Sequence, residues 1–467
     1  MDQNPPRDVD VGELLENRRL GRFQVLTLIL GAVTLFVDGL DFSAPNVAAQ
    51  SIVSAFHAKA SDMGLIFGWG YFGMFIGSVI LGAVGDRYGR KAGVVLGVLA
   101  YSLPALITVF AGSVDEMALW RFLAGLGIGG VVPNAIALLT ETAPKRFRVS
   151  FVMVAFVGYS SGNALSAQIA AWFIPVYGWA IVFLAAGFAG LALSVLLIVA
   201  LPESIPFLAA TRPGSPRLRP LLLRAAPELR LAPETRIVLR RAANEAKFSL
   251  KLLFTSYRRF ATPLLWVAFF GESLTFMTLS SWLTTILEQA GLPQMQTRLV
   301  FSGGAVAAIV AIVVFGRLID RFGPRAAVVS AVSAVGAIIF LGTPGLSPAV
   351  VIIAAIVAYP CAAATHQALN GIVGGFYPTI VRGNGVGYAT GMGRIAAILG
   401  PVIVGYLMSA KVPLREVLLF IAAPDLMVAA ACVGLDFLRR SPSAVADFAH
   451  AAPRPHANET LAEELLA

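Results

Sequence analysis

The chain has 467 residues, of which 57% are hydrophobic and only 13% are charged. A soluble globular protein carries about 25% charged residues, and the mean hydropathy of +0.79 implies more apolar surface than a soluble interior of this size can hold. The composition excludes a soluble enzyme and a disordered chain, and it indicates an integral membrane protein. The net charge of +9 raises the question of nucleic acid, but the placement of the basic residues indicates membrane orientation instead, so no nucleic-acid partner is expected.

Twelve segments are long and apolar enough to cross a membrane, since a span needs about 20 mostly apolar residues. Strands of a membrane barrel would alternate polar and apolar residues, and these runs do not. We therefore predict an all-α membrane protein with twelve transmembrane helices. Their expected ranges are 23–50, 61–84, 92–112, 117–140, 149–174, 178–201, 262–288, 297–319, 326–343, 347–373, 385–409 and 414–437.

The basic residues predict the orientation. If the N-terminus is cytoplasmic, 29 of the 35 Lys and Arg residues fall in inner segments and 4 in outer loops, as expected when positive charge stays inside. Both termini are therefore expected in the cytoplasm, in a plasma (inner) membrane protein. The first apolar run is too long for a signal peptide, so the first helix is expected to stay in the membrane.

The chain divides into five expected regions. These are a cytoplasmic N-terminal segment over 1–22, a six-helix half over 23–201, a cytoplasmic central loop over 202–261, a second six-helix half over 262–437 and a cytoplasmic tail over 438–467. The central loop is expected to contain a basic amphipathic helix from Glu234 to Phe260. Anionic lipid of the inner leaflet is the expected partner of this helix, in preference to a protein partner.

A duplicated loop is the main sign of internal symmetry. Residues 82–91 read GAVGDRYGRK and residues 316–325 read GRLIDRFGPR, 234 residues later, and each copy joins the second span of its half to the third. Gly, Asp, Arg, Gly and a closing basic residue share their spacing. Two homologous six-helix halves are therefore predicted, with pseudo-symmetry and a site at their interface near mid-membrane.

This repeat resembles the signature of the major facilitator superfamily, although Pro324 stands where a basic residue is usual. The resemblance implies a twelve-helix transporter that works by alternating access. The acid of the first copy, Asp86, is expected to face a helix N-terminus or an arginine across the seam. We favour gating over a role of these charges in topology alone. The expected gating residues are Gly82, Asp86, Arg87, Gly89, Arg90, Gly316, Asp320, Arg321, Gly323 and Arg382.

Two acids lie within the first span. Asp38 and Asp41 are three residues apart and share a helix face. Two desolvated carboxylates this close should not both ionise at neutral pH and should titrate as a pair. Proton carriage is favoured over a structural pairing with a buried arginine. Arg121, at the start of the fourth span, is a possible counter-charge, although it could also lie near the outer surface.

Glycines follow Arg121 in the fourth span, in the string RFLAGLGIGG. They predict a smooth face for close helix packing. The string also contains GxGxxG, but no strand precedes it and no βαβ unit surrounds it, so a dinucleotide site is rejected. No cofactor and no metal site is expected.

The second half has its own intramembrane polar groups. Glu272 lies 234 residues after Asp38, and His366 opens the segment HQALN, which also contains Gln367 and Asn370. For His366 a helix contact and a binding role are equally open. Arg394 suits a carboxylate, because arginine stays charged and can donate to two oxygens at once. Asp425 lies in the last span, where a structural role is favoured.

Several segments resemble one branch of the superfamily, the aromatic acid:proton symporters. The resemblance rests on DGLD at 38–41, RFLAGLGIGGVVPNAIALLTE at 121–141, SWLTTILEQAGLP at 281–293 and YPTIVRGNGVGYATGMGRIAAILGP at 377–401. The HQALN segment departs from the branch, which more often has Gly before the Gln. The resemblance implies that Asp38, Asp41, Arg121, Glu141, Asp86, Arg382 and Arg394 are essential, with Glu141 joining the proton-coupling group.

The expected function is import of a benzoate-like or hydroxybenzoate-like carboxylate with a proton, by a monomer. An aromatic carboxylate needs a cation, a ring-sized apolar pocket and polar fixing groups. The alternatives are symport of another organic acid or a sugar, and proton-driven efflux; a membrane enzyme or sensor is disfavoured. The expected substrate-binding residues are Arg394, Asn163, Tyr159, Trp282, His366, Gln367, Asn370, Tyr388 and Glu272.

Overall fold

The computed structural model describes residues 8–16, 18, 20–229, 231, 235–239, 250–377 and 379–440, with the backbone alone at 8, 250, 251, 320, 374 and 379–383. Within these ranges, twelve helices are long and apolar enough to cross a membrane, which confirms the predicted fold class. The first six are α2 (Arg22–Phe56), α3 (Ala60–Tyr88), α4 (Arg90–Thr108), α5 (Val114–Thr142), α6 (Arg148–Tyr177) and α7 (Ala180–Ala200). The second six are α10 (Arg258–Gln289), α11 (Gln294–Phe322), α12 (Pro324–Leu341), α13 (Pro348–Val373), α14 (Thr379–Ser409) and α15 (Leu414–Arg439).

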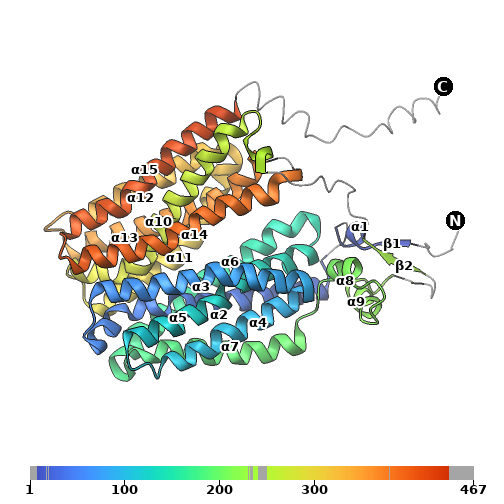
Figure 1. Ribbon diagram of the computed structural model, residues 1–467, viewed down its shortest axis with the longest axis horizontal. Helices are drawn as coiled ribbons and strands as arrows, with labels where there is room; N and C mark the ends of the chain where they lie inside the picture. Colours follow the sequence, from blue (N-terminus) through green and yellow to red (C-terminus); the bar gives the residue numbers. More distant parts are fainter. Residues whose placement is uncertain are drawn as a thin grey trace.

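The helices form two bundles, α2–α7 and α10–α15 (Figure 1). Two helix pairs carry most of the contact between them, α3 against α14 and α6 against α11. In each pair the second span of one half packs on the fifth span of the other. The two pairs are therefore equivalent by a pseudo-two-fold axis, as expected for duplicated halves.

Small residues allow the closest approach between the halves. Gly64 of α3 lies so near α14 that an added Cβ would come 2.9 Å from the carbonyl oxygen of Pro401 and 3.2 Å from the Cα of Gly405. Thr284 of α10 donates to the carbonyl oxygen of Asn46, at 2.9 Å. All these residues lie in the parts of their helices that lead to the loops over 57–59, 290–293 and 410–413. We call this the far end of the bundle; the ribbons of the two halves separate toward the opposite end (Figure 1).

A small folded unit covers that opposite end of the first half. It consists of β1 (Asp8–Asp10), α1 (Val11–Glu16), α8 (Ile205–Thr211), α9 (Leu218–Ala225) and β2 (Arg236–Val238). β1 and β2 pair in parallel, with Val9 opposite Ile237, and Val11, Leu15, Phe207, Leu208 and Leu222 form an apolar cluster inside the unit. We call this unit the cap, and the end of the bundle that it covers the cap end.

The prediction of a helix in the central loop is wrong over part of its length. Residues Arg236–Val238, inside the expected helix from Glu234 to Phe260, form strand β2, because backbone pairing with the N-terminal segment satisfies their hydrogen bonds instead. Near the end of the segment, a 3-10 turn, Leu250–Phe254, precedes α10. Residues 240–249 lie outside the described part of the chain.

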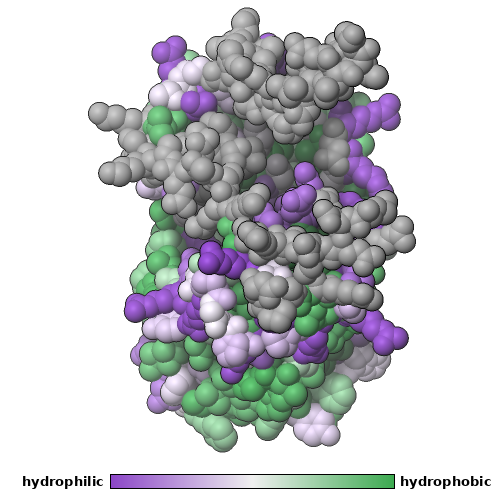
Figure 2. All heavy atoms as spheres, turned by 90° about the vertical axis from the view of Figure 1, so that its right-hand side faces the viewer, coloured by the Kyte–Doolittle hydropathy of each residue, from purple (hydrophilic) through white to green (hydrophobic). Residues whose placement is uncertain are grey.

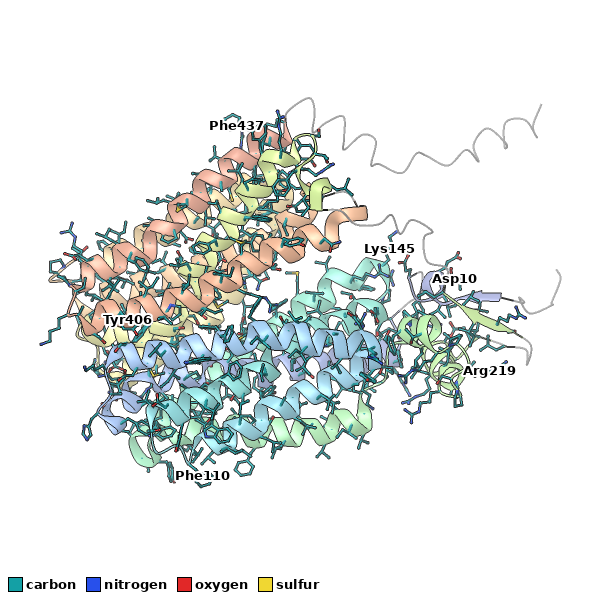
Figure 3. All side chains as sticks on the ribbon, in the orientation of Figure 1. Asp10, Phe110, Lys145, Arg219, Tyr406 and Phe437 are labelled. Atoms are coloured by element: carbon teal, nitrogen blue, oxygen red, sulfur yellow. The ribbon has the colours of Figure 1, made fainter. Side chains whose placement is uncertain are left out.

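Charged residues gather at the cap end. Asp10, Lys145, Arg219 and Phe437 lie at this end, whereas Phe110 and Tyr406 lie at the other (Figure 3). Viewed from the cap end, hydrophilic residues fill much of the surface that is not grey, and hydrophobic residues flank it (Figure 2). This is the distribution of a bundle whose sides face lipid and whose ends face water.

Candidate functional site

The two acids of α2 are buried in the first half. Asp38 and Asp41 have no exposed side-chain surface. Nη1 of Arg121, from α5, lies 3.4 Å from Oδ2 and 3.5 Å from Oδ1 of Asp41. Arg121 is itself buried, and its guanidinium lies over the ring of Phe183, 4.9 Å from the centroid. Arg121 is therefore an intramembrane counter-charge for Asp41, and it does not lie at the outer surface.

Asp38 has no such partner. Neither carboxyl oxygen has a hydrogen-bond partner, and the buried hydroxyl of Tyr101 also lacks one. Burial of an unpaired charge in the membrane is costly, so such an acid is expected to hold a proton or to exchange it during function. The structure thus gives the two acids different surroundings, one facing a cation and one unpaired.

Backbone contacts between helices hold this pair in place. An added Cβ on Gly39, between the two acids, would come 2.2 Å from the carbonyl oxygen of Tyr159 in α6. On the other side, α5 reaches α3 through Gly125, whose added Cβ would come 2.2 Å from the carbonyl oxygen of Gly70. Only glycine allows such approach, which is why the glycines after Arg121 bring its helix against α3.

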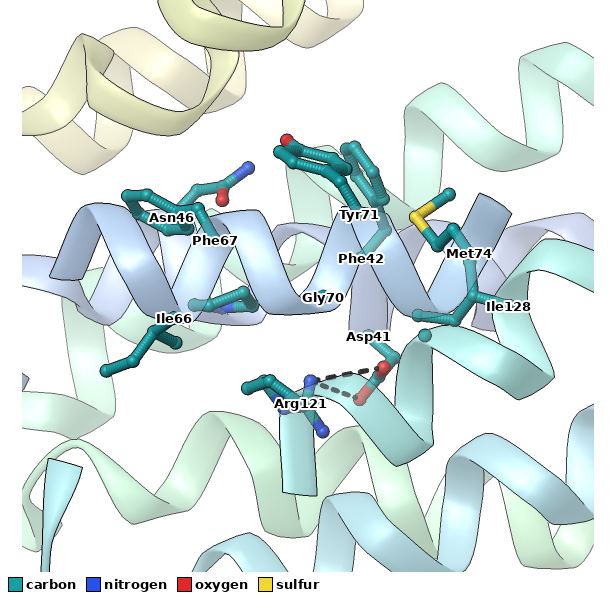
Figure 4. Close-up of a pocket in the computed structure, with 12 residues that line it drawn as sticks. Asp41, Phe42, Asn46, Ile66, Phe67, Gly70, Tyr71, Met74, Arg121 and Ile128 are labelled. Carbon is teal, nitrogen blue, oxygen red and sulfur yellow. Dashed lines mark hydrogen bonds and ion pairs between the residues drawn. The ribbon is translucent and has the colours of Figure 1, made fainter. Parts of the chain in front are cut away.

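A pocket opens beside the ion pair. Its lining residues come from α2, α3 and α5 and are Asp41, Phe42, Pro45, Asn46, Ile66, Phe67, Gly70, Tyr71, Met74, Arg121, Gly125 and Ile128. Asp41 and Arg121 face each other across the dashed contacts, with Tyr71 and Met74 nearby (Figure 4). The pocket therefore combines aromatic and aliphatic walls with one buried ion pair, which is the composition of a site for an apolar ring with a polar group.

Aromatic residues extend this wall toward the second half. Phe42 contacts Tyr71 at 5.9 Å and Tyr159 at 5.7 Å between ring centroids. The hydroxyl of Tyr71 lies 2.9 Å from Oγ of Ser281 in α10. Asn163, one turn after Tyr159, is buried with its Oδ1 unpartnered. Tyr71 and Phe42 were not predicted, because aromatic residues are common in apolar spans and nothing in their spacing distinguishes these two.

Trp282 packs at the contact between α10 and α14. It is buried against Phe67, at 5.3 Å between centroids, and its Nε1 donates to the carbonyl oxygen of Pro401 at 3.0 Å. Its only polar hydrogen is therefore used to join α10 to α14. Trp282 is a packing element between helices in this structure, and its contact with substrate stays a prediction.

Arg394 of α14 reaches across the seam between the halves. It donates to Oγ of Ser78 and to the carbonyl oxygen of Met74, the latter at 3.4 Å. Met74 also lines the pocket. No carboxylate lies within ion-pair distance of this guanidinium among the side chains that the structure describes. The arginine is a partly buried cation without an anion at the edge of the pocket.

The second half contains a separate polar group. Nδ1 of His366 in α13 lies 2.5 Å from Oε2 of Glu272 in α10. Asn370 donates to the carbonyl oxygen of His366 at 2.9 Å, and Gln367 is half-buried beside it. Tyr388 is 45% exposed and contacts Trp266 at 6.3 Å between centroids. None of these residues lines the pocket beside Asp41.

Glu141 lies at the other end of α5 from Arg121. It accepts hydrogen bonds from Nε of Arg90, at 3.2 Å, and from the hydroxyl of Ser204. These residues are at the cap end of α5, 20 residues after Arg121 and so about 30 Å along the helix. Glu141 is thus far from Asp38 and Asp41, and its place in the proton-coupling group stays a prediction.

The first copy of the repeat forms a compact charged turn. Arg90 bridges Glu141 and Asp86, so Asp86 pairs within its own half and does not reach an arginine across the seam. Gly89, between α3 and α4, has φ 119°, and an added Cβ would come 2.0 Å from Oε2 of Glu203. Arg87 is exposed beside Tyr88. Around Gly82 no atom lies within 4 Å of an added Cβ.

The second copy keeps the turn but changes its partners. Gly323 joins α11 to α12 with φ 66°, and Arg325 donates to Asp436 of α15 at 2.7 Å. Arg321 lies over the ring of Phe322, and around Gly316 an added Cβ would meet open space. The side chains of Asp320 and Arg382 lie outside the described part of the structure. In the residues described, no group of His, Cys, Asp and Glu is placed to hold a metal ion.

The comparisons with known proteins agree with the fold. A family model for the Major Facilitator Superfamily matches residues 31–401 and 265–458. The chain is similar to a solved bacterial homolog of the human lysosomal transporter Spinster, with a TM-score of 0.68 over 94% of this chain and 100% of that one, at 16% identity. The protein is thus a multi-pass membrane transporter. It belongs to the Major Facilitator Superfamily.

Curated relatives cover nearly the whole chain. It is 32% identical to the gallate transporter of Pseudomonas putida, over 95% of this chain and 99% of that protein. It is 29% identical to the benzoate transport protein of Acinetobacter baylyi, over 87% and 88%. It is 30% identical to the 3-(3-hydroxy-phenyl)propionate transporter of Escherichia coli, over 89% and 95%. These relatives are transporters, not enzymes.

Proposed function

We propose that the protein imports an aromatic carboxylate together with a proton by alternating access. The observation that carries this proposal is a buried acid pair, Asp38 and Asp41, beside a pocket with aromatic walls and next to an arginine without an anion, Arg394. Relatives named as transporters of gallate, benzoate and 3-(3-hydroxy-phenyl)propionate support the substrate class.

The carboxylate of the substrate would bind Arg394. That guanidinium now donates to Ser78 and to the Met74 carbonyl, and a carboxylate would replace two weak acceptors by a bidentate one. The ring would lie against Phe42, Tyr71 and Tyr159, with the free Oδ1 of Asn163 accepting from a ring hydroxyl. Gln367, Asn370 and Tyr388 are more distant candidates for the opposite wall.

The proton would be carried by the acids of α2. Moving an anion into a negative interior costs about 2.3 kcal/mol per 100 mV. A proton that travels with the anion cancels this cost. Asp38 has no counter-charge, whereas Asp41 forms an ion pair with Arg121. Asp38 can therefore accept a proton while the Asp41–Arg121 pair stays intact.

Movement of the halves would open and close the pocket. The far end is joined by hydrogen bonds and small-residue contacts, whereas the halves separate at the cap end (Figure 1). The repeated turns at Gly82–Arg90 and Gly316–Arg325, with Arg382, would exchange partners at the cap end as it closes. In this proposal the cap end faces the cytoplasm, with both termini there, in a plasma-membrane monomer.

The placement of basic residues at the cap end favours contact with anionic lipid. Arg212, Arg217, Arg224 and Arg259 lie exposed on the described parts of the cap and of the start of α10. Each basic residue near an anionic surface contributes about 1 kcal/mol of attraction. The inner leaflet is thus the proposed lipid partner.

The test is uptake by purified protein in liposomes. An inward proton gradient should drive accumulation of labelled 4-hydroxybenzoate, gallate or benzoate, and Asp38→Asn and Asp41→Asn should abolish the accumulation. The matched control is Asp115→Asn, an exposed acid in α5, which should transport normally. Equal accumulation by the Asp38 and Asp41 variants would refute the proton role. Expulsion of substrate instead of uptake would favour efflux, and transport of only non-aromatic acids would exclude the proposed substrate class.

A further inference from the structure

The second half has a buried acid–imidazole pair that the proposed function does not use. Oε2 of Glu272 and Nδ1 of His366 are 2.5 Å apart, so one proton lies between them. The other oxygen of Glu272, Oε1, is buried and has no hydrogen-bond partner. Phe276 stacks on the imidazole at 5.2 Å and limits its rotation.

The charges around this pair are few. Asp425 of α15 is the neighbouring acid, and it is fully buried. The guanidinium of Arg394, from α14, is directed to α3 instead. Residues 299–316 of α11 and 326–341 of α12 contain no titratable group, and the remaining titratable groups of α13 are Tyr359 and Cys361. His366 is thus the basic group beside Glu272, and Asp425 lies near the same carboxyl group.

Exposure to water differs between His366 and Asp425. The side chain of His366 is 21% exposed, whereas Asp425 has no exposed surface. Asn370, one turn further on the same helix face, is also exposed. A polar helix face within a membrane faces a water-filled cavity and not lipid. The His366–Glu272 pair can therefore exchange its proton. Asp38 lies one turn from Asp41, which lines the pocket, whereas no residue of α15 lines it. Asp425 is therefore expected to keep one protonation state during transport.

The pair is placed to respond to the substrate. Ser273 follows Glu272 and lies against Gly393 of α14, where an added Cβ would come 2.5 Å from Oγ of Ser273. Arg394 follows Gly393 and is the proposed partner of the carboxylate. If Arg394 leaves Ser78 to bind an anion, the helical turn that contains Gly393 and Arg394 would shift. Because Gly393 lies against Ser273, this shift would displace the neighbouring Glu272.

From these observations we infer that Glu272 and His366 form a second proton-binding site, so that each half carries one proton and two protons cross with each carboxylate. This inference rests on the proposed function. It also replaces the expected substrate contact of these residues, because neither residue lines the pocket beside Asp41. Two protons with one anion carry one net positive charge inward, so the membrane potential adds about 50-fold accumulation per 100 mV.

The experiment measures the net charge moved. Full-length protein in liposomes is given a tenfold gradient of labelled 4-hydroxybenzoate at equal pH, with the potential clamped by potassium and valinomycin. Two protons per anion predict that net flux stops at about 59 mV, since one charge balances a tenfold gradient at that potential. One proton per anion predicts no dependence on potential. Glu272→Gln and His366→Asn should each make the net flux independent of the potential.

The matched control is Asp425→Asn, which should keep the null potential near that of the unmodified protein. The inference is overturned if the unmodified protein ignores the potential, if Glu272→Gln retains the same null potential, or if Asp425→Asn loses it. Absence of any transport by the unmodified protein would instead refute the proposed function. If Glu272→Gln binds but does not transport, calorimetric titration in two buffers of different ionisation enthalpy counts the protons taken up on binding. Fewer protons than in the unmodified protein support the second site, and equal numbers exclude it.

Discussion

Arg298 of α11 donates its Nε to the carbonyl oxygen of Val47 in α2, at 3.2 Å across the seam. The same guanidinium donates to the carbonyl oxygen of Ala170, at 3.3 Å, and to Oγ of Ser51, at 2.9 Å. All three acceptors belong to the first half, and the side chain is only 1% exposed. One buried cation from the second half thus joins two helices of the first at the far end.

Removal of this cation should loosen the far end. Hydrogen bonds to charged groups contribute about 1.5–3 kcal/mol each, so Arg298→Ala should raise the open population at this end at least about tenfold. The measurement is the rate at which a membrane-impermeant maleimide, added on the side of the membrane that the far end faces, labels Asn46→Cys, with Cys361 and Cys432 replaced by alanine. Arg415→Ala, an exposed arginine at the same end, is the control and should leave the rate unchanged. An unchanged rate in Arg298→Ala would show that the small-residue contacts alone keep this end closed.

The acid pair should respond unequally to neutralisation. Asp41→Asn leaves Arg121 as a buried cation without an anion, and breaking a buried pair in this way costs about 3–5 kcal/mol. Asp38 has no partner to lose, so Asp38→Asn should change stability little. Thermal unfolding in detergent, followed by size-exclusion chromatography, checks both.

A double variant tests the cause. Arg121→Gln with Asp41→Asn removes both charges and should recover most of the stability lost in Asp41→Asn alone. A double variant as unstable as the sum of the two single variants would mean that Asp41 and Arg121 contribute independently, contrary to the ion pair.

Two glycines near the end of α3, Gly82 and Gly85, should differ in how well they tolerate replacement by alanine. An added Cβ on Gly85 would come 1.6 Å from Oδ1 of Asn134. The amide of Asn134 donates to the carbonyl oxygens of Leu81 and Gly130, at 2.9 and 2.8 Å, so it cannot move without losing both bonds. Gly85→Ala should therefore destabilise by about 1–3 kcal/mol. Gly82→Ala, which meets open space, should melt like the unmodified protein; equal losses in the two variants would contradict this packing.

Glu203, in the loop after α7, should make stability depend on pH. Burial raises the pKa of Glu203 above its ordinary value of 4.5, although hydrogen bonds from the backbone N–H groups of Ser204 and Lys91 oppose this. The folded state then holds the proton more tightly than the unfolded state. The stability from this group is complete below pH 4.5 and falls as the pH rises through the raised pKa.

The variant Glu203→Gln should lose this dependence. The melting temperature of the variant minus that of the unmodified protein should increase as the pH rises from 4.5 toward neutrality. A constant difference between the two melting temperatures over that range would mean that the N–H donors fully offset burial.

The twelve helices were predictable because length and apolar composition alone define a span. The ion pair was harder to predict, since the depth of Arg121 depends on how closely α3 and α5 approach through Gly70 and Gly125. Arg298 was counted with the outer loops, because hydropathy does not distinguish a cation that ends a span from one that folds back into the seam.

Two other features depend on contacts that leave no local pattern. β1 and β2 have three residues each and pair across most of the first half of the chain, so no alternation or turn announces them. Glu141 was grouped with the acids by resemblance, although about 20 helical residues place it at the other end of its helix. The spacing between Arg121 and Glu141 in the sequence was sufficient to show that they lie far apart along one helix.

The glycine contacts between α2 and α6 have a consequence for how cargo preference can change. Besides Gly39, an added Cβ on Gly158 or Gly162 would come 2.4 or 1.9 Å from a carbonyl oxygen of α2. The acids are thus set in a rigid backbone frame, whereas the aromatic walls are side chains that can be exchanged one at a time. Evolution could therefore retune the cavity for differently decorated rings while the energy-converting residues keep their geometry.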